Sequence, residues 1–145
     1  MVEIRAERPD DFPVIREIIS ETMRTLTADL VDLIRESADY MPQLSRVAVT
    51  ASQEVVGYVM LSRVKLMGTR TRSVLSLAPL AVRERLQRSG IGSALVHDVV
   101  EAADQTGELA VVFLGHADYY PRFGFAPARQ LGIGAPWRSH LPEGG

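Results

Sequence analysis

The residues best suited to binding an anion lie where a β-rich run ends in a Gly-x-Gly turn. The turn reads Gln87-Arg88-Ser89-Gly90-Ile91-Gly92-Ser93, and a helical pattern follows it. The first turn of a helix has unpaired N–H groups at the positive end of the helix dipole, and glycines let a bulky anion approach the backbone. The spacing predicts a cradle for a phosphate group, with a plain tight turn as the alternative.

Two well-known phosphate motifs are excluded at this turn. A P-loop needs Gly-Lys followed by Ser or Thr, and the chain lacks that triplet. A dinucleotide fingerprint needs a third small residue, but Leu95 stands there and the supporting strand comes halfway along the chain.

A second group of reactive side chains follows the apolar run at residues 109–114. It contains His116, Asp118, Tyr119 and Tyr120. A continuous apolar run is typical of a strand buried on both faces, and active sites favour the carboxyl ends of such strands. This segment is therefore a candidate for proton transfer, with aromatic packing and an ordinary loop histidine as the alternatives.

Composition narrows the function classes. The chain has 145 residues, a net charge of −2 and no cysteine, which excludes disulfides, thiolate metal sites and a cysteine nucleophile. The charge balance argues against non-specific nucleic-acid binding, and no apolar run is long enough to span a membrane. Residues 63–88 carry seven basic side chains and one acidic one, which favours a small anionic ligand. The N-terminus does not resemble a secretory signal, so we expect a cytoplasmic protein.

The elements that must position these groups can be read from periodicity. Residues 2–5 alternate like a strand, and Asp11 is expected to cap a helix that runs to Met23. A second helical pattern extends through Leu26, Leu30, Leu33, Ile34 and Met41 and is expected to end at Pro42.

The middle of the chain reads as strands. Residues 46–51 and 55–64 form a predicted hairpin, and a looser turn is expected at residues 67–71. Residues 74–82 form a third strand, which Pro79 must bulge or split because proline cannot donate a ladder hydrogen bond.

Helix and strand then alternate to the end of the domain. A helix is expected from Gly90 to about Gly107, then strands at residues 109–114 and 125–128. The fold class is α/β, with a single mixed, mostly antiparallel sheet flanked by helices. Residues 1–130 form the expected domain, and residues 131–145 an irregular tail.

The two reactive segments together resemble the GNAT family of N-acetyltransferases. The resemblance depends on Gln87 to Gly92 with its preceding strand, and on Tyr120-Pro-Arg-Phe-Gly-Phe125; it covers residues 2 to about 128. Pro79-Leu80-Ala81-Val82 looks like one branch of small bacterial acetyltransferases. The resemblance implies a GNAT fold with a shortened C-terminus and acetyl-CoA as co-substrate, without a metal.

The resemblance also implies roles for individual residues. The pantetheine arm would lie along Leu80, Ala81 and Val82 of the bulged strand. The pyrophosphate would rest on backbone N–H groups of the turn, which belong to Arg88, Ser89, Gly90, Ile91, Gly92 and Ser93. Gln87 matches the Gln or Arg that opens this turn in the family, whereas Arg88 departs from the common Gly. Tyr120 matches the tyrosine beside the cofactor sulfur.

A direct-attack mechanism follows from the chemistry of a thioester. A lysine-like amine has a pKa of about 10.4 and must lose a proton before it attacks, and the departing thiolate benefits from a donor of similar pKa, such as tyrosine at about 10. Tyr120 is the expected donor. Ser76 stands where some family members carry a glutamate base, and Glu21, His116 and Asp118 are further candidates, so the base stays open.

Three readings of function remain at this point. The leading one is an acetyl-CoA-dependent N-acetyltransferase acting on a small-molecule or peptide amine, with no nucleic-acid or membrane partner. The second is a non-catalytic acyl-CoA-binding domain, favoured by Ser76 in place of an acid. The third is a protein that binds nucleotide phosphates. The proline- and glycine-rich tail should form little or no final strand, so we expect Trp137 with the tail, or a second subunit, to cover an apolar sheet edge, and we favour a homodimer.

Overall fold

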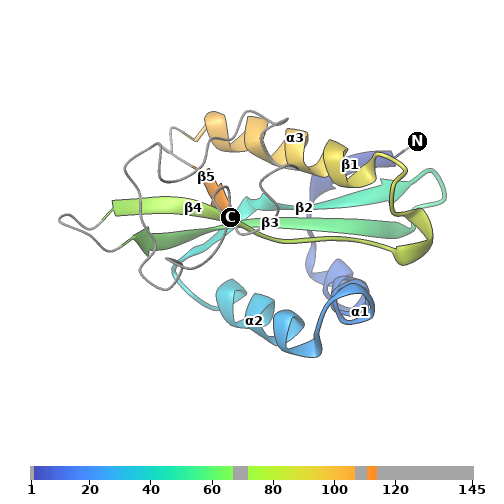
Figure 1. The fold of residues 1–145 in the computed structure, drawn as a ribbon, viewed down its shortest axis with the longest axis horizontal. Helices are drawn as coiled ribbons and strands as arrows, with labels where there is room; N and C mark the ends of the chain where they lie inside the picture. Colours follow the sequence, from blue (N-terminus) through green and yellow to red (C-terminus); the bar gives the residue numbers. More distant parts are fainter. Residues whose placement is uncertain (1, 67–71, 107–110, 114–145) are drawn as a thin grey trace.

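The computed structural model describes residues 2–66, 72–106 and 111–113. Along the chain the elements are β1 (Val2–Ala6), η1 (Pro9–Asp11), α1 (Phe12–Thr22), α2 (Thr25–Arg35), β2 (Tyr40–Thr50), β3 (Val55–Leu66), β4 (Arg72–Val82), η2 (Glu84–Leu86), α3 (Ile91–Asp104) and β5 (Val111–Phe113). The described strands form one sheet in the order β1-β2-β3-β4-β5 (Figure 1). The first four are antiparallel and β5 is parallel to β4. The predicted mixed, mostly antiparallel sheet is confirmed.

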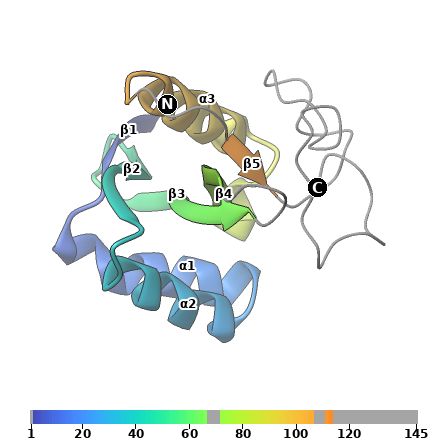
Figure 2. The same ribbon diagram turned by 90° about the vertical axis from the view of Figure 1, so that its left-hand side faces the viewer.

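Helices cover both faces of the sheet. Helices α1 and α2 lie on one face and α3 lies on the other (Figure 2). The core on the α3 side includes Leu61, Leu75 and Leu95, and the core on the α1 side includes Ile18 and Tyr58. Alternating strand residues face opposite sides, so each strand of this sheet can contribute to both cores.

Helix α1 begins where the sequence predicts, but the Asp11 side chain does not cap it. The carboxylate of Asp11 accepts hydrogen bonds from the Arg8 N–H at 2.8 Å and from the Arg5 guanidinium at 2.7 and 3.1 Å. It therefore ties β1 to the start of the helix instead of capping α1. The Arg5 hydrogen bond holds the pKa of Asp11 below its usual value, against the opposing effect of burial.

The second helix and the following strand differ from the sequence prediction. Helix α2 ends at Arg35, and β2 begins at Tyr40, so Pro42 lies within a strand instead of ending a helix. The register of β2 against β3 shifts between Tyr40 and Ser45, which accommodates the missing proline N–H. Pairing with β3 makes this segment a strand, although its local apolar spacing favoured a helix.

The expected turn at residues 67–71 and everything expected beyond residue 113 lie outside the described residues. This includes His116, Asp118, Tyr119, Tyr120, the strand at 125–128 and the tail with Trp137. Among the described residues, none of the helices is both long enough and apolar enough to cross a membrane.

Candidate functional site

The bulge that Pro79 requires is present in β4. The register pairs Val59 with Leu80 and Leu61 with Leu77, so Ala78 and Pro79 together oppose the single residue Met60 of β3. Proline cannot donate to the ladder, and the extra residue removes that demand.

The strand beyond the bulge faces two environments. Leu80 and Val82 pack on the α3 side, while Ala81 is buried against the α1 side. Pairing of β4 with β5 is described from Leu75 to Leu77. Within the described residues, the β4 backbone from 78 to 82 therefore has no β5 partner along that edge.

The turn after β4 is closed by its own polar groups. The Gln87 amide Nε2 donates to the Val82 carbonyl at 3.2 Å, and the Ser89 hydroxyl donates to the Leu86 carbonyl. Two residues adopt left-handed backbone, Arg88 at φ 66° and Gly90 at φ 92°. Glycine suits such a position because it lacks a Cβ. At Arg88 the same conformation carries a cost, which the turn tolerates.

Helix α3 begins without a side-chain cap. Its first hydrogen bond runs from the Ala94 N–H to the Gly90 carbonyl at 3.0 Å. The N–H groups of Ile91, Gly92 and Ser93 precede that bond, so the helix ladder does not use them. They stand at the positive end of a fourteen-residue helix, which is a favourable place for an anion.

A pocket of about 480 Å³ lies between the end of β4 and the start of α3. Its lining consists of Leu80, Val82, Gln87, Arg88, Gly90, Gly92 and Ser93. Every one of these residues belongs to the set for which the sequence predicted cofactor contact. The fold thus brings the strand end and the turn together around one cavity.

A glycine in β3, which sequence reasoning missed, lets α3 approach this pocket. A Cβ placed on Gly57 would lie 2.9 Å from Leu95 Cδ1 and 3.2 Å from Ile91 Cγ2. Gly57 also pairs with Val82, a lining residue. A lone glycine in a β-branched strand is the available sequence signal for such a close approach.

An ionic clasp joins the end of α1 to the start of the turn. Arg83 Nη1 contacts Glu17 Oε1 at 2.9 Å and Glu21 Oε1 at 3.2 Å, and the Glu84 N–H donates to Glu21 Oε2 at 3.2 Å. Burial lowers the pKa of the Arg83 guanidinium, but the two carboxylates outweigh it and raise that pKa. Two like charges one helical turn apart repel each other, and Arg83 compensates both.

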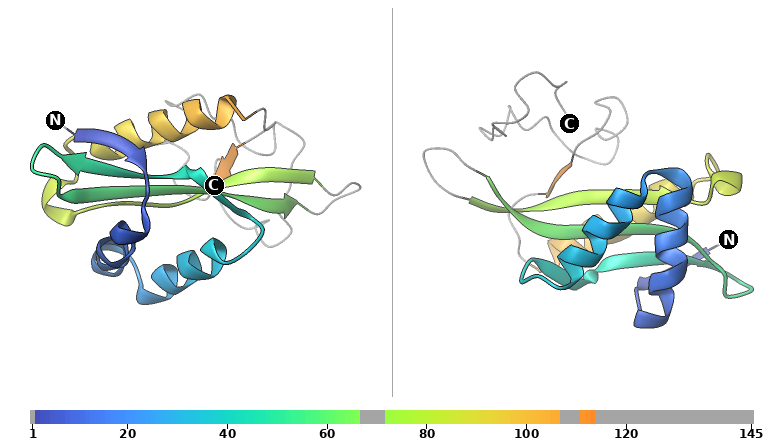
Figure 3. Two further views of the ribbon diagram at one scale, coloured as in Figure 1. Left: turned by 180° about the vertical axis from the view of Figure 1, so that it is seen from behind. Right: turned by 90° about the horizontal axis from the view of Figure 1, so that it is seen from below.

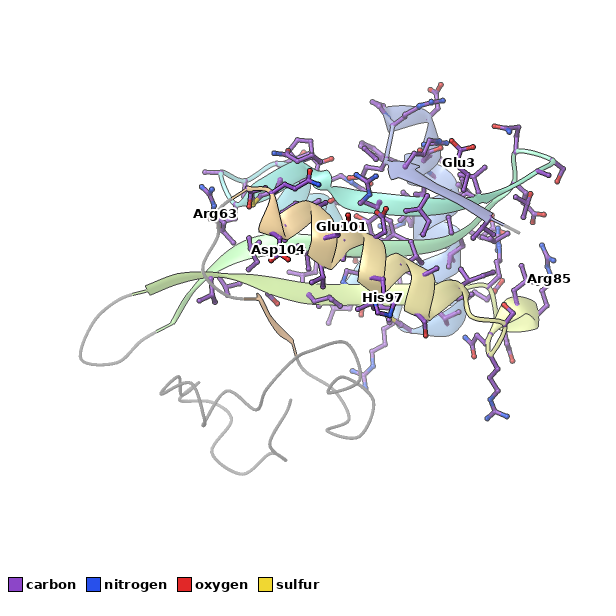
Figure 4. The ribbon with its side chains drawn as sticks, turned by 90° about the horizontal axis from the view of Figure 1, so that it is seen from above. Glu3, Arg63, Arg85, His97, Glu101 and Asp104 are labelled. Carbon is purple, nitrogen blue, oxygen red and sulfur yellow. The ribbon has the colours of Figure 1, made fainter. Side chains whose placement is uncertain are left out.

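The clasp changes how the basic stretch is interpreted. Arg83 is paired with α1, and Arg85, labelled in Figure 4, is paired with Glu54 at 2.6 Å. Arg88 lines the pocket and has no carboxylate partner among the described residues. Much of the local positive charge is therefore used to fix the turn, and Arg88 is the cation that lines the cavity.

The candidate proton-transfer residues are only partly described. Ser76 pairs with Ser62 of β3 and lies before the bulge, whereas Glu21 belongs to the clasp. His116, Asp118 and Tyr120 lie outside the described residues, so their predicted roles stay predictions. His97 is exposed on α3 (Figure 4). Among the described residues, no three His, Asp or Glu side chains group together as a metal site.

Comparison with known proteins decides the family. The model of the acetyltransferase (GNAT) family matches residues 4–125. This chain belongs to the GNAT family. The uncharacterized N-acetyltransferase YhbS of Escherichia coli K12 is 34% identical over 135 residues, which is 92% of this chain and 79% of that protein. The uncharacterized N-acetyltransferase YjhQ of the same strain is 37% identical over 118 residues, 80% of this chain and 64% of YjhQ.

Solved GNAT structures agree with the fold. A GNAT acetyltransferase from Brucella melitensis in complex with acetyl-CoA has a TM-score of 0.78 and 28% identity, covering 87% of this chain and 83% of that one. Escherichia coli YhbS in complex with CoA has a TM-score of 0.79 and 31% identity, covering 89% of this chain and 71% of that one.

Proposed function

We propose that this chain transfers an acetyl group from acetyl-CoA to a primary amine by direct attack in a ternary complex. The observation that carries the proposal is the pocket between the bulged end of β4 and the uncapped start of α3. Membership of the GNAT family and the coenzyme A complexes of two structural relatives support it.

The donor set fits the coenzyme's chemistry. The N–H groups at the start of α3 suit a diphosphate, and Arg88 adds a cation beside them. The β4 edge at 78–82, which has no β5 partner among the described residues, would offer backbone groups to the amides of a pantetheine arm, with Leu80 and Val82 as its apolar support. Bound there, acetyl-CoA would supply an activated acyl carbon that a neutral amine can attack.

We assign the remaining roles from chemistry and from the resemblance to the GNAT family. Tyr120 donates a proton to the departing thiolate. Glu21 accepts hydrogen bonds from Arg83 Nη1 and from the Glu84 N–H, so its carboxylate already holds the start of the turn against α1. We therefore give Glu21 a positioning role. Ser76 with a held water, His116 and Asp118 stay as candidates for accepting the proton, and the acceptor is a small-molecule or peptide amine.

Calorimetric titration with acetyl-CoA, beside a thiol-release assay over a panel of amines, tests the proposal. We expect binding together with amine-dependent release of coenzyme A. Binding without turnover on any amine would instead indicate a non-catalytic acyl-CoA-binding domain. Stronger binding of ATP or NAD than of coenzyme A would overturn the cofactor assignment.

Two variants locate the roles. Gly90→Glu adds a side chain and a negative charge beside the pocket and should weaken acetyl-CoA binding at least about tenfold. Tyr120→Phe should lower turnover by about 10²- to 10⁴-fold while binding persists, because the ring can still pack but the proton donor is lost. Unchanged turnover and pH profile in Tyr120→Phe would make Tyr119 the next candidate.

A further inference from the structure

Helix α2 is apolar on two opposite faces. Its inner face buries Ala28 and Val31 against the core. Its outer face carries Leu26, Leu30 and Leu33, which are 70%, 54% and 63% exposed. These three residues, called here the leucine stripe, follow the spacing i, i+4, i+7 of one helix face. Leucines so exposed and so spaced are typical of a helix that packs against another helix.

The leucine stripe lies on the outside of the molecule. Helix α2 is on the opposite side of the sheet from α3, and the view from below shows it at the surface (Figure 3, right). The pocket beside the α3 turn is lined by residues of β4, of the turn and of α3. The stripe is therefore separate from the proposed acetyl-CoA site.

The charges beside the stripe are compensated within the chain. Asp29 and Asp32 pair with Arg16 at 2.5 and 3.0 Å, and Arg35 also contacts Asp32 at 2.9 Å. The border of the stripe is thus close to neutral. Such a face does not attract nucleic acid or an anionic membrane, which need an excess of positive charge.

The two ends of α2 carry opposite charges that are not compensated by salt bridges of the described residues. Arg24 precedes the helix and Glu36 follows it, and both side chains are exposed. Among the described residues neither forms a salt bridge with another side chain. Each is six residues from Leu30, or roughly 9 Å along the helix at 1.5 Å per residue.

We propose that α2 packs antiparallel against α2 of a second copy, with the two-fold axis passing beside Leu30. A two-fold interface is self-complementary, so the residue on the axis meets itself and residues equidistant from it meet each other. Leu30 then faces its own copy, and Leu26 interleaves with Leu33 of the other chain. Arg24 of each copy approaches Glu36 of the other, which places two opposite-charge pairs at the ends of the contact.

The small area of the outer face of α2 limits how tightly two copies can bind each other. An eleven-residue helix is only about 16 Å long, and its outer face is well below the roughly 800 Å² per partner of a standard interface. We therefore expect a dimer with a micromolar dissociation constant, seen as a concentration-dependent mass in sedimentation or light scattering.

Crosslinking tests the geometry directly because the natural chain has no cysteine. Leu30→Cys places one thiol per chain beside the axis, where a short bismaleimide should join two copies. Ser52→Cys, in the exposed turn between β2 and β3, is the matched control and should crosslink far less. Equal crosslinking of the two variants would show random collision and overturn the proposal.

Charge exchange supplies a second test that does not alter the apolar stripe. Arg24→Glu should weaken the dimer about tenfold, because two surface pairs, each worth at most a few-fold in affinity, become repulsions. Glu36→Arg should do the same, and the Arg24→Glu/Glu36→Arg double variant should recover the natural affinity. Failure of the double variant to recover, or a natural chain that stays monomeric at several hundred micromolar, would overturn the proposal. A dimer that Leu30→Asp leaves intact in folded protein would place the interface elsewhere.

Discussion

Replacing Gly57 by alanine tests whether this glycine sets the position of α3 over the sheet. The new Cβ would lie 2.9 Å from Leu95 Cδ1 and 3.2 Å from Ile91 Cγ2. Leu95 is completely buried and Ile91 is 8% exposed, so neither side chain can simply turn away. These side chains must therefore repack within the core, or α3 must move outward by a few tenths of an ångström.

The magnitude follows from two opposing effects. Overpacking a core costs about 1–3 kcal/mol, and alanine recovers about 0.5–1 kcal/mol that glycine loses in a strand. We expect Gly57→Ala to lower the free energy of unfolding by about 1–2 kcal/mol. A shift of the start of α3 relative to Val82 should also lower the affinity for coenzyme A, by about three- to tenfold.

Urea denaturation followed by circular dichroism measures the first quantity, and calorimetric titration with coenzyme A measures the second. Leu95→Val removes part of the clashing side chain, so the Gly57→Ala/Leu95→Val double variant should be more stable than the sum of the single effects predicts, by about 1 kcal/mol. A Gly57→Ala protein as stable as the natural chain and with the same affinity would refute the close-packing argument.

Three further predictions concern the turn, the Arg83 clasp and Asp11. Gly90→Ala should lower the free energy of unfolding by about 1–2 kcal/mol through its φ of 92° alone, since nothing lies within 4 Å of the added Cβ. Gly90→Asn should lower it less, because asparagine tolerates this conformation. Equal losses of stability in urea denaturation would contradict this explanation. Arg83→Met removes the cation between Glu17 and Glu21 and should raise the KM for acetyl-CoA more than it lowers kcat, whereas Arg85→Met, which breaks an exposed pair, should change neither by more than about twofold. Asp11→Asn should lower the free energy of unfolding by about 1.5–3 kcal/mol at pH 7. Because the Asp11 pKa is lowered in the folded state, the difference from the natural chain should shrink as the pH falls below about 4. A stability difference that does not depend on pH would exclude the carboxylate as its source.

The sequence was enough to predict those features of the fold that follow from the backbone properties of a single proline or glycine. Pro79 lacks an N–H, so it required a bulge in β4 whatever strand lay beside it, and the bulge is present. The Gly-x-Gly turn predicted the start of a helix from Gly90, and α3 begins at Ile91 directly after that glycine. Of the turn residues for which the GNAT resemblance implied cofactor contact, Gln87, Arg88, Gly90, Gly92 and Ser93 line one pocket.

Only the tertiary structure decided which surfaces meet. Helix α2 has apolar residues on both faces, and periodicity favoured Leu26 and Leu30, yet the core takes Ala28 and Val31. Ala28 and Val31 belong to the core cluster that includes residues of α1 and the sheet, and spacing along one helix cannot show which of two apolar faces meets that cluster.

The Arg83 clasp and the close approach of α3 to Gly57 likewise depend on residues that are distant in the sequence. Arg83 and Glu21 are 62 residues apart, and Gly57 meets a helix that begins more than thirty residues later. A sequence pattern reports neighbours within a turn or a strand, whereas these contacts exist because the fold packs α3 against β3 and brings the end of β4 beside α1. The sequence by itself determined the chemistry of the turn, and the packing of distant elements determined how that turn is held.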